Sequence, residues 1–157
     1  MPRRYSRKSY PTKKYSYDKK LQTFSGLLTG GTQTAITLFI AQEAVILKGL
    51  RVNGAISDLA TAGPSLFQWA IVTTREGYTP NTLNITNGDL YIPEQDVWCW
   101  GTGISSARSA TDADWIYEFD TNPKTSRKLQ EGDTLSLLVR SVSNGVASVT
   151  AQFFVGN

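Results

Sequence analysis

The segment Thr134–Val155, TLSLLVRSVSNGVASVTAQFFV, carries the clearest signal for the fold. In both of its halves apolar residues recur at every second position, and in an extended chain such residues face the same side. The pattern therefore predicts two half-buried β-strands. The linker Ser143-Asn144-Gly145 predicts a tight hairpin between them, because Asn and Gly both tolerate positive φ. The predicted buried faces carry Leu135, Leu137 and Val139 in the first strand and Ala147, Val149, Ala151, Phe153 and Val155 in the second.

The chain before this segment also reads as strands separated by turns. Runs rich in β-branched and aromatic residues predict further strands at Ala35–Ile40, Ala44–Val52, Leu66–Val72 and Asp114–Asp120. Turn signals occur at Gly30-Gly31, Asn53-Gly54, Gly63-Pro64 and Asn87-Gly88. No long helix is indicated. With Leu21–Leu28 as a possible first strand, we expect roughly seven to nine strands, which suits a β-sandwich or a jelly roll.

The composition argues against an enzyme. The chain has no histidine and one cysteine, which excludes an internal disulfide, a Cys/His zinc site and a histidine-based catalytic relay. Common phosphate-loop, dinucleotide and zinc-protease motifs are absent. Cys99 lies in a strand-like run and is expected to be a small buried apolar residue. We expect no catalytic residue, no metal and no cofactor, and the absence of a long apolar run or signal peptide predicts no membrane association.

The excess positive charge is concentrated at the N-terminus. Residues 1–20 carry eight Lys or Arg against one acid, a net charge of +7, whereas eight bases meet twelve acids in the remaining chain, a net charge of −4. A like-charged stretch with Pro and Ser is expected to be disordered by itself. We therefore divide the chain into a basic arm, residues 1–20, and a folded domain, residues 21–157.

The arm has the composition of a single-strand-binding segment. Lys and Arg neutralise phosphates and release counterions, and flat tyrosine rings can stack on unpaired bases. A solubilising tail or a nuclear-localisation signal is the alternative reading of such a basic run. The predicted nucleic-acid-binding residues are Arg3, Arg4, Arg7, Lys8, Lys13, Lys14, Lys19 and Lys20, with Tyr5, Tyr10, Tyr15 and Tyr17 between them.

The tryptophans admit two interpretations. Exposed rings on a β-sandwich could stack on sugars, whereas rings in the core or between subunits would be buried. Trp98 and Trp100 are expected to share one face of an extended strand, and Trp115 to share a face with Tyr117 and Phe119. We take Trp98, Trp100 and Trp115 as candidates for a subunit contact.

One segment resembles a known family. The stretch Thr125–Leu135, TSRKLQEGDTL, followed by Leu137-Leu138-Val139, is similar to the R-K-L-x-x-G-D-x-L-x-L segment that leads into a late strand of capsid proteins from circular Rep-encoding single-stranded DNA viruses. It covers about a tenth of the chain. The basic arm and the all-β body extend the similarity in kind.

The resemblance implies an eight-stranded antiparallel jelly roll and a small icosahedral T=1 shell of about sixty identical subunits. It implies that the basic arm faces a packaged single-stranded DNA genome and can direct import into the host nucleus through an import receptor. The protein would then be found in the virion, and in the nucleus during assembly.

Other functions remain open on the sequence. Coat proteins of small satellite RNA viruses also combine a short basic arm with a jelly roll. The sequence therefore supports a capsid role more strongly than it supports DNA rather than RNA as the packaged nucleic acid. A non-viral β-sandwich that binds RNA or carbohydrate is the further alternative. The acidic net charge of the folded domain argues against the RNA-binding version.

Overall fold

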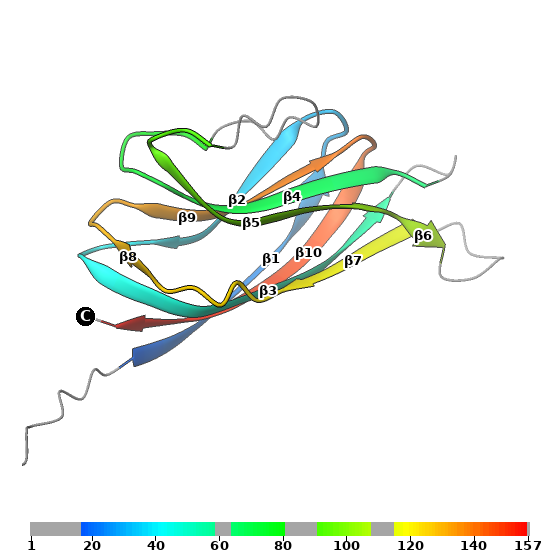
Figure 1. Cartoon of the computed structure of the whole chain (residues 1–157). Coiled ribbons are helices and arrows are strands. Elements are labelled where there is room, and N and C mark those ends of the chain that lie inside the picture. The colour runs from blue at the N-terminus through cyan, green and yellow to red at the C-terminus, as the bar shows by residue number, and fades with distance from the viewer. Residues whose placement is uncertain (1–16, 59–63, 81–90, 108–114, 157) are drawn as a thin grey trace, which may run out of the picture.

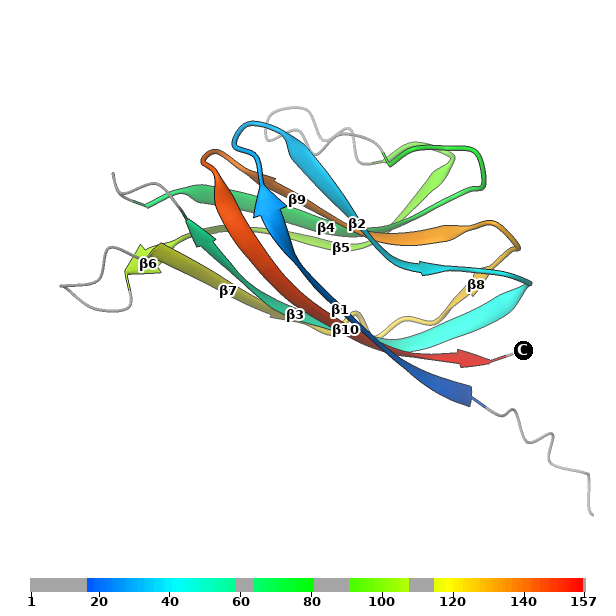
Figure 2. The ribbon, with the colours of Figure 1, turned by 180° about the vertical axis from the view of Figure 1, so that it is seen from behind.

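The part of the chain that the structure describes is an all-β sandwich of two antiparallel sheets. The structure is a computed structural model and describes residues 17–58, 64–80, 91–107 and 115–156. Within these residues there are ten strands and no helix. The two sheets lie face to face (Figure 1), as the view from behind also shows (Figure 2). The strands are β1 (Tyr17–Leu28), β2 (Gln33–Ile40), β3 (Val45–Asp58), β4 (Leu66–Thr74), β5 (Gln95–Ile104), β6 (Ser106–Ala107), β7 (Trp115–Thr121), β8 (Arg127–Leu129), β9 (Thr134–Ser141) and β10 (Gly145–Gly156).

The chain passes repeatedly from one sheet to the other. The six-stranded sheet has the order β1-β10-β3-β7-β6, with β8 paired to one end of β3. The four-stranded sheet has the order β2-β9-β4-β5. Strands that are neighbours in a sheet are therefore mostly distant in sequence, as β1 and β10 are. This order brings the start of β1 next to the C-terminal end of β10.

The core fills the space between the sheets. The alternation predicted from the sequence is confirmed by burial for β10. The prediction of a half-buried strand is wrong for β9, which is buried on both faces: Leu135, Leu137 and Val139 lie in the core between the sheets, and Ser136 and Leu138 are buried on the other face. Burying each of the larger side chains stabilises the fold by about 1.5–3 kcal/mol. The fully buried side chains include Leu47, Leu50, Val52, Ile56 and Phe153 from the six-stranded sheet and Phe67, Ile71, Leu135 and Leu137 from the four-stranded sheet.

The predicted hairpin between the last two strands is wrong. β9 and β10 lie in different sheets and do not pair, so the segment between them crosses the edge of the sandwich. Neither Asn144 nor Gly145 has a positive φ. Instead, the Asn144 Oδ1 atom accepts a hydrogen bond of 2.8 Å from the Gly30 amide, which ties this crossing to the crossing from β1 to β2. Alternation identified the strands, but it carried no information about which strands pair.

The turn predicted at Asn53-Gly54 is also wrong, because both residues lie inside β3. A Cβ atom on Gly54 would lie 2.9 Å from the Ser148 carbonyl oxygen and 3.0 Å from the Phe119 ring. Gly54 therefore serves close packing within the sheet rather than a change of chain direction. The turn signals at Asn87-Gly88 and at Gly63 lie outside the described residues.

The boundary between arm and folded domain also needs correction. β1 begins at Tyr17 rather than Leu21, and its ladder with β10 starts at the pair Tyr17 and Gly156. The last four residues of the predicted arm, Tyr17 to Lys20, are thus part of the sheet. Pairing with β10 outweighs the local preference of a charged segment for disorder. Residues 1–16 lie outside the described residues, so the disordered arm stays a prediction.

Two glycines of β5 provide space for aromatic rings that join the sheets. Gly101 and Gly103 pair with Trp69 and Phe67 of β4. The Trp69 ring lies against Gly101, and its Nε1 atom donates a hydrogen bond of 3.1 Å to the hydroxyl of Tyr117 in the other sheet. The Tyr117 ring lies over Gly103 and is stacked with Phe67 at 5.8 Å between centroids. Because these two positions have no Cβ atom, the rings can lie directly against the backbone of β5.

We expect Gly103→Ala to lower the free energy of unfolding by about 1–3 kcal/mol, because the added Cβ atom overpacks this site. It would lie 1.9 Å from the Tyr117 ring, which must then move away from Phe67. Urea denaturation followed by circular dichroism measures the change. Thr102→Ala, at the exposed position between the two glycines, is the control and is expected to cost much less. Equal stability of Gly103→Ala and the unchanged protein would contradict the packing described here.

Candidate nucleic-acid interface

Three of the twelve predicted nucleic-acid-binding residues lie in the described part of the chain. Tyr17, Lys19 and Lys20 lie at the start of the edge strand β1, directly after residue 16. The other nine lie outside the described residues, so their placement stays a prediction. These are Arg3, Arg4, Tyr5, Arg7, Lys8, Tyr10, Lys13, Lys14 and Tyr15.

The register of β1 against β10 decides which way these side chains point. Lys19 is opposite Phe154, and Lys20 is opposite Phe153. Phe153 is fully buried between the sheets, so Phe154 and Lys19 point to the outer face of the six-stranded sheet. Lys20 points to the inner side, yet it is exposed to solvent. Two neighbouring lysines thus present their charges on opposite sides of the sheet.

Tyr17 also lies on the outer face, where it contacts a lysine of another strand. The Lys48 Nζ atom of β3 is 3.2 Å from the centroid of the Tyr17 ring, a cation–π contact that contributes about 0.5–1 kcal/mol at a partly exposed site. A Cβ atom on Gly156 would lie 2.5 Å from the ring. The ring therefore lies across the Gly156 backbone, which only a residue without a side chain allows.

A second aromatic ring lies on the same face against a second glycine. The pairing of β10 with β3 shifts register between Gln152 and Phe154, and Gly49 at this irregularity has a φ of 60°. Such a left-handed glycine is typical of a β-bulge. A Cβ atom on Gly49 would lie 3.0 Å from the Phe154 ring. The bulge thus lets the half-buried Phe154 ring lie close to the backbone of β3.

The short strand β8 adds a further lysine. Lys128 pairs with Ile46, whereas its neighbours Arg127 and Leu129 pair with the inward-facing Leu47 and Val45. Lys128 therefore points to the outer face, where it is exposed. We call this group the basic end of the outer face. It consists of Tyr17, Lys19, Lys48, Lys128 and Phe154, which come from β1, β3, β8 and β10.

The basic end carries net positive charge. Among the described residues, no carboxylate forms an ion pair with Lys19, Lys48 or Lys128. The nearest ion pair along β3 joins Arg51 to Asp120 of β7. Arg51 donates a hydrogen bond of 3.1 Å from Nε to Asp120 Oδ1 and one of 2.5 Å from Nη2 to Oδ2. The hydrogen bonds from Arg51 hold the pKa of Asp120 below its ordinary value. Both side chains are exposed, so the pair balances charge and adds little stability.

The rest of the outer face has the opposite character. Beyond Arg51, a shallow depression between β10, β3 and β7 is lined by small residues such as Ala55 and Ser148 and by Glu118 and Asp120. Within its described residues, the strand predicted at Asp114–Asp120 thus has exposed carboxylates, Glu118 and Asp120, on its outer face. Charge on the outer face thus changes from positive at the basic end to negative at β7, which favours polyanions at one end only.

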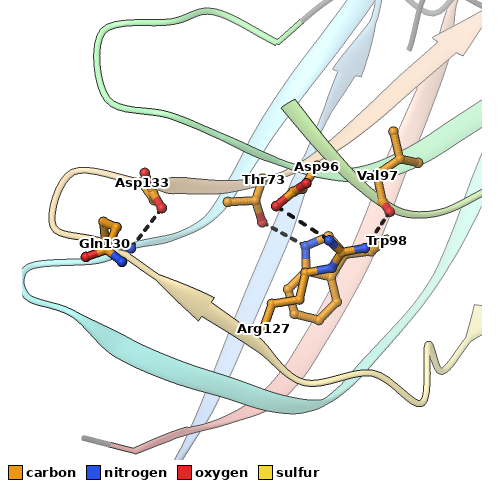
Figure 3. A network of polar contacts seen from close by, with 7 residues as sticks. All are labelled: Thr73, Asp96, Val97, Trp98, Arg127, Gln130 and Asp133. Atoms are coloured by element: carbon orange, nitrogen blue, oxygen red, sulfur yellow. Dashed lines mark hydrogen bonds and ion pairs between the residues drawn. The ribbon is translucent and has the colours of Figure 1, made fainter. Parts of the chain in front are cut away.

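The segment that carries the family resemblance has a structural role (Figure 3). Arg127 donates a hydrogen bond of 2.9 Å from Nη2 to the Val97 carbonyl, lies 3.5 Å from Asp96 and is placed over the Trp98 ring at 5.5 Å. It therefore connects β8 to β5 in the opposite sheet. In the following turn, the Asp133 Oδ2 atom accepts a hydrogen bond of 2.8 Å from the Gln130 amide.

The turn of the same segment requires its glycine. Gly132 has a φ of 83°, in the left-handed region that favours glycine. Its amide donates a hydrogen bond of 2.8 Å to the Ala41 carbonyl, which fixes the turn against the end of β2. The R-K-L-x-x-G-D pattern is thus explained by sheet pairing, a clamp between the sheets and a tight turn.

The two tryptophans of β5 do not share a face, contrary to the prediction. The pairing of β4 with β5 shifts register after Ile71, so that Trp98 is the extra residue of a bulge. Trp98 is 8% exposed and belongs to the core, whereas Trp100 is 56% exposed. The Trp98 Nε1 atom donates a hydrogen bond of 2.7 Å to the Thr73 hydroxyl. Trp98 is therefore corrected to a core position. Trp100 and the half-buried Trp115 remain candidates for a subunit contact.

Cys99 lies where the sequence predicted, half-buried against the core. Burial raises the pKa of its thiol, although a contact of 3.5 Å with the Thr121 hydroxyl partly offsets this. A protonated thiol is a poor nucleophile at neutral pH. Within residues 17–58, 64–80, 91–107 and 115–156, no group of three or more Cys, Asp or Glu could hold a metal ion. The same residues include no helix long and apolar enough to cross a membrane.

Comparison with known proteins adds no assignment. No protein-family model matches the chain, and no curated protein matches its sequence. Its function is therefore inferred from the chain itself.

Proposed function

We propose that the protein is a viral coat protein that assembles into a closed shell of identical subunits and packages nucleic acid through its basic N-terminal arm. More particularly, we assign it to the circular Rep-encoding single-stranded DNA viruses. The observation that carries the proposal is the separation of charge, +7 in residues 1–20 against −4 in the remaining chain. Such a polarised chain can bind a polyanion with one end while its body forms protein contacts.

The strand order supports a jelly roll as the finer description of the sandwich. Eight of the ten strands have seven or more residues, and they form the orders β1-β10-β3-β7 and β2-β9-β4-β5. Successive long strands alternate between the sheets except at β4 and β5, which pair directly. Two interleaved Greek keys produce this arrangement, and the double-sheet jelly roll is a recurrent fold of viral capsid proteins and lectins.

The choice of single-stranded DNA rests on the resemblance of Thr125–Leu135 to capsid proteins of that virus class. It implies assembly in the host nucleus. The coat protein of a satellite-like RNA virus is the alternative, since phosphate neutralisation and stacking do not distinguish DNA from RNA. A carbohydrate-binding module is less well supported, because Trp69 and Trp98 are buried in the core and Trp115 is half-buried, which leaves Trp100 as the one exposed tryptophan.

We expect the purified full-length protein to elute in size exclusion with light scattering as a particle of about one megadalton, as closed symmetry with about sixty subunits requires. Its absorbance at 260 nm should exceed that at 280 nm because nucleic acid is enclosed. DNase and RNase digestion of the extracted nucleic acid then separates the two viral alternatives. A monomer or small oligomer that persists at low salt with added single strands would contradict the coat-protein proposal.

A further inference from the structure

We propose that the basic end of the outer face is a second binding surface for single-stranded DNA, built into the folded domain and separate from the arm. The inference rests on the proposed function and extends it to Lys48, Lys128 and Phe154, which lie far from the arm in sequence. At this surface, bases stack on Tyr17 and Phe154. Lys19, Lys48 and Lys128 contact the adjoining phosphates.

The first argument is the shape of the surface. Tyr17 lies across Gly156, and Phe154 lies against Gly49, so two glycines allow both rings to lie close to the sheet. Aromatic rings on an open sheet face can stack with bases of any sequence, because every base has a π face. Gly49 achieves this through a positive φ of 60°, at the bulge that places Phe154 opposite Lys48.

The second argument is charge. Lys19, Lys48 and Lys128 converge from three strands on the same end of the face, and the acidic residues Glu118 and Asp120 lie at its other side, on β7. Because Arg51 balances the charge of Asp120, the negative charge beside the depression comes from Glu118. A polyanion is therefore attracted to the ring-bearing end rather than to the depression at β7. The pattern is that of a single-strand-binding surface, in which cations follow the backbone and rings hold the bases.

The third argument is continuity with the arm. Residue 16 is followed directly by Tyr17, so the arm is covalently joined to one residue of the basic end. Two linked binding segments act together at a high effective concentration, which raises the overall affinity.

The contact of Lys48 with Tyr17 shows how a base can enter. The Lys48 Nζ atom covers one face of the ring at 3.2 Å. This cation–π contact is weaker than a base–aromatic stack, so an arriving base displaces the ammonium. On its flexible four-carbon stem the ammonium then moves to the neighbouring phosphate. The free protein thus keeps the ring ordered until DNA binds.

The ring contribution is tested by fluorescence anisotropy with fluorescein-labelled oligothymidylate of twelve nucleotides. The full-length protein is first dispersed into subunits and freed of bound nucleic acid, because the particle expected above already holds nucleic acid. We expect Tyr17→Leu and Phe154→Leu each to weaken binding about five- to a hundredfold, and the loss should persist at high salt because stacking releases no counterions. Tyr78→Leu is the control, because it removes a 55% exposed tyrosine ring from the connection after β4, away from the basic end. It should change the affinity less than about twofold.

The charge contribution is tested with Lys128→Ala, an exposed position at which loss of folding is not expected. The slope of log K against log salt should fall by about 0.7 if one phosphate contact is lost. Arg75→Ala removes one exposed charge from the connection after β4 in the opposite sheet, and should leave the slope unchanged.

The results separate this inference from the coat-protein proposal. If Tyr17→Leu, Phe154→Leu and Lys128→Ala all bind like the unchanged protein, the arm alone binds DNA and the second surface is disproved, although packaging can still occur. If these variants weaken binding but no particle forms under any condition, the coat-protein proposal fails and the second surface stands. Equal losses for oligothymidylate and dextran sulfate in Tyr17→Leu would show that no base stacks there and would overturn the ring assignment.

Discussion

Protein that lacks residues 1–16 is expected to fold and to assemble, but to enclose little nucleic acid. This segment carries six of the eight bases of the predicted arm and no acid. In a shell of about sixty subunits its removal takes away roughly 360 positive charges, and with them the release of counterions that drives nucleic-acid binding. The ratio of absorbance at 260 nm to that at 280 nm should fall most of the way to the value of protein alone.

The site of truncation matters because the arm and the sheet overlap. Deletion of residues 1–20 would also remove Tyr17 to Lys20, which pair with Gly156 to Phe153 of β10. Lost ladder hydrogen bonds contribute about 0.5–1.5 kcal/mol each, so the longer deletion should lower the free energy of unfolding by a few kcal/mol. Thermal unfolding of the dispersed subunits, followed by circular dichroism, distinguishes the two deletions. Equal melting temperatures would show that the first residues of β1 add nothing to the sheet.

A substitution control separates charge from length. Full-length protein in which the six bases of residues 1–16 are replaced by Gln retains the arm and its tyrosines. It should package as little as the truncated protein, because neutralisation of phosphates depends on charge. Short oligonucleotides should still bind weakly to both proteins through the basic end. Normal packaging by either protein would overturn the role assigned to the arm.

The strands could be predicted from the sequence, but their partners could not. Alternation at Leu135, Leu137 and Val139 identifies the face of β9 that packs in the core between the sheets, but it does not report that Leu138 on the other face is buried too. It does not report that β9 pairs with β2 and β4 while β10 pairs with β1 and β3. The Asn144-Gly145 signal does not produce a hairpin, because β9 and β10 pair with other strands in different sheets. Asn144 instead accepts a hydrogen bond from the Gly30 amide.

The candidate site could be predicted only in its local part. The arm is visible in composition, because its charges are adjacent in sequence. Lys48, Lys128 and Phe154 join Tyr17 only through the registers of three strand pairs and a bulge at Gly49. No local pattern marks such positions. A single isolated lysine in a strand-like run is the only signal that the sequence offers for Lys48.

Replacing Trp98 and replacing Trp100 by Ala should have very different effects on stability, although the residues are two positions apart. Trp98→Ala is expected to lower the free energy of unfolding by about 3–5 kcal/mol, which is enough to unfold many domains of this size. It empties a core position, leaves the Thr73 hydroxyl without its indole partner and exposes the side of Arg127 that lies over the ring.

Trp100→Ala removes the same atoms from a side chain that is 56% exposed, so its cost should be below about 1 kcal/mol. Urea denaturation of dispersed subunits at low concentration measures both variants, because assembly would otherwise add its own stabilisation. Similar costs at the two positions would mean that the bulge after Ile71 does not separate them.

Trp100→Ala also tests the more exposed of the two remaining candidates for a subunit contact. An exposed Trp on a sheet face is costly to leave in water and is enriched at interface cores, so Trp100 is expected to be covered when subunits assemble. Trp100→Ala should then give folded protein that assembles at higher concentration or not at all. Thr102→Ala, at the next position on the same exposed face, controls for a general effect of substitution on β5. Unchanged assembly of Trp100→Ala would place the subunit contact elsewhere, with Trp115 as the next position to test.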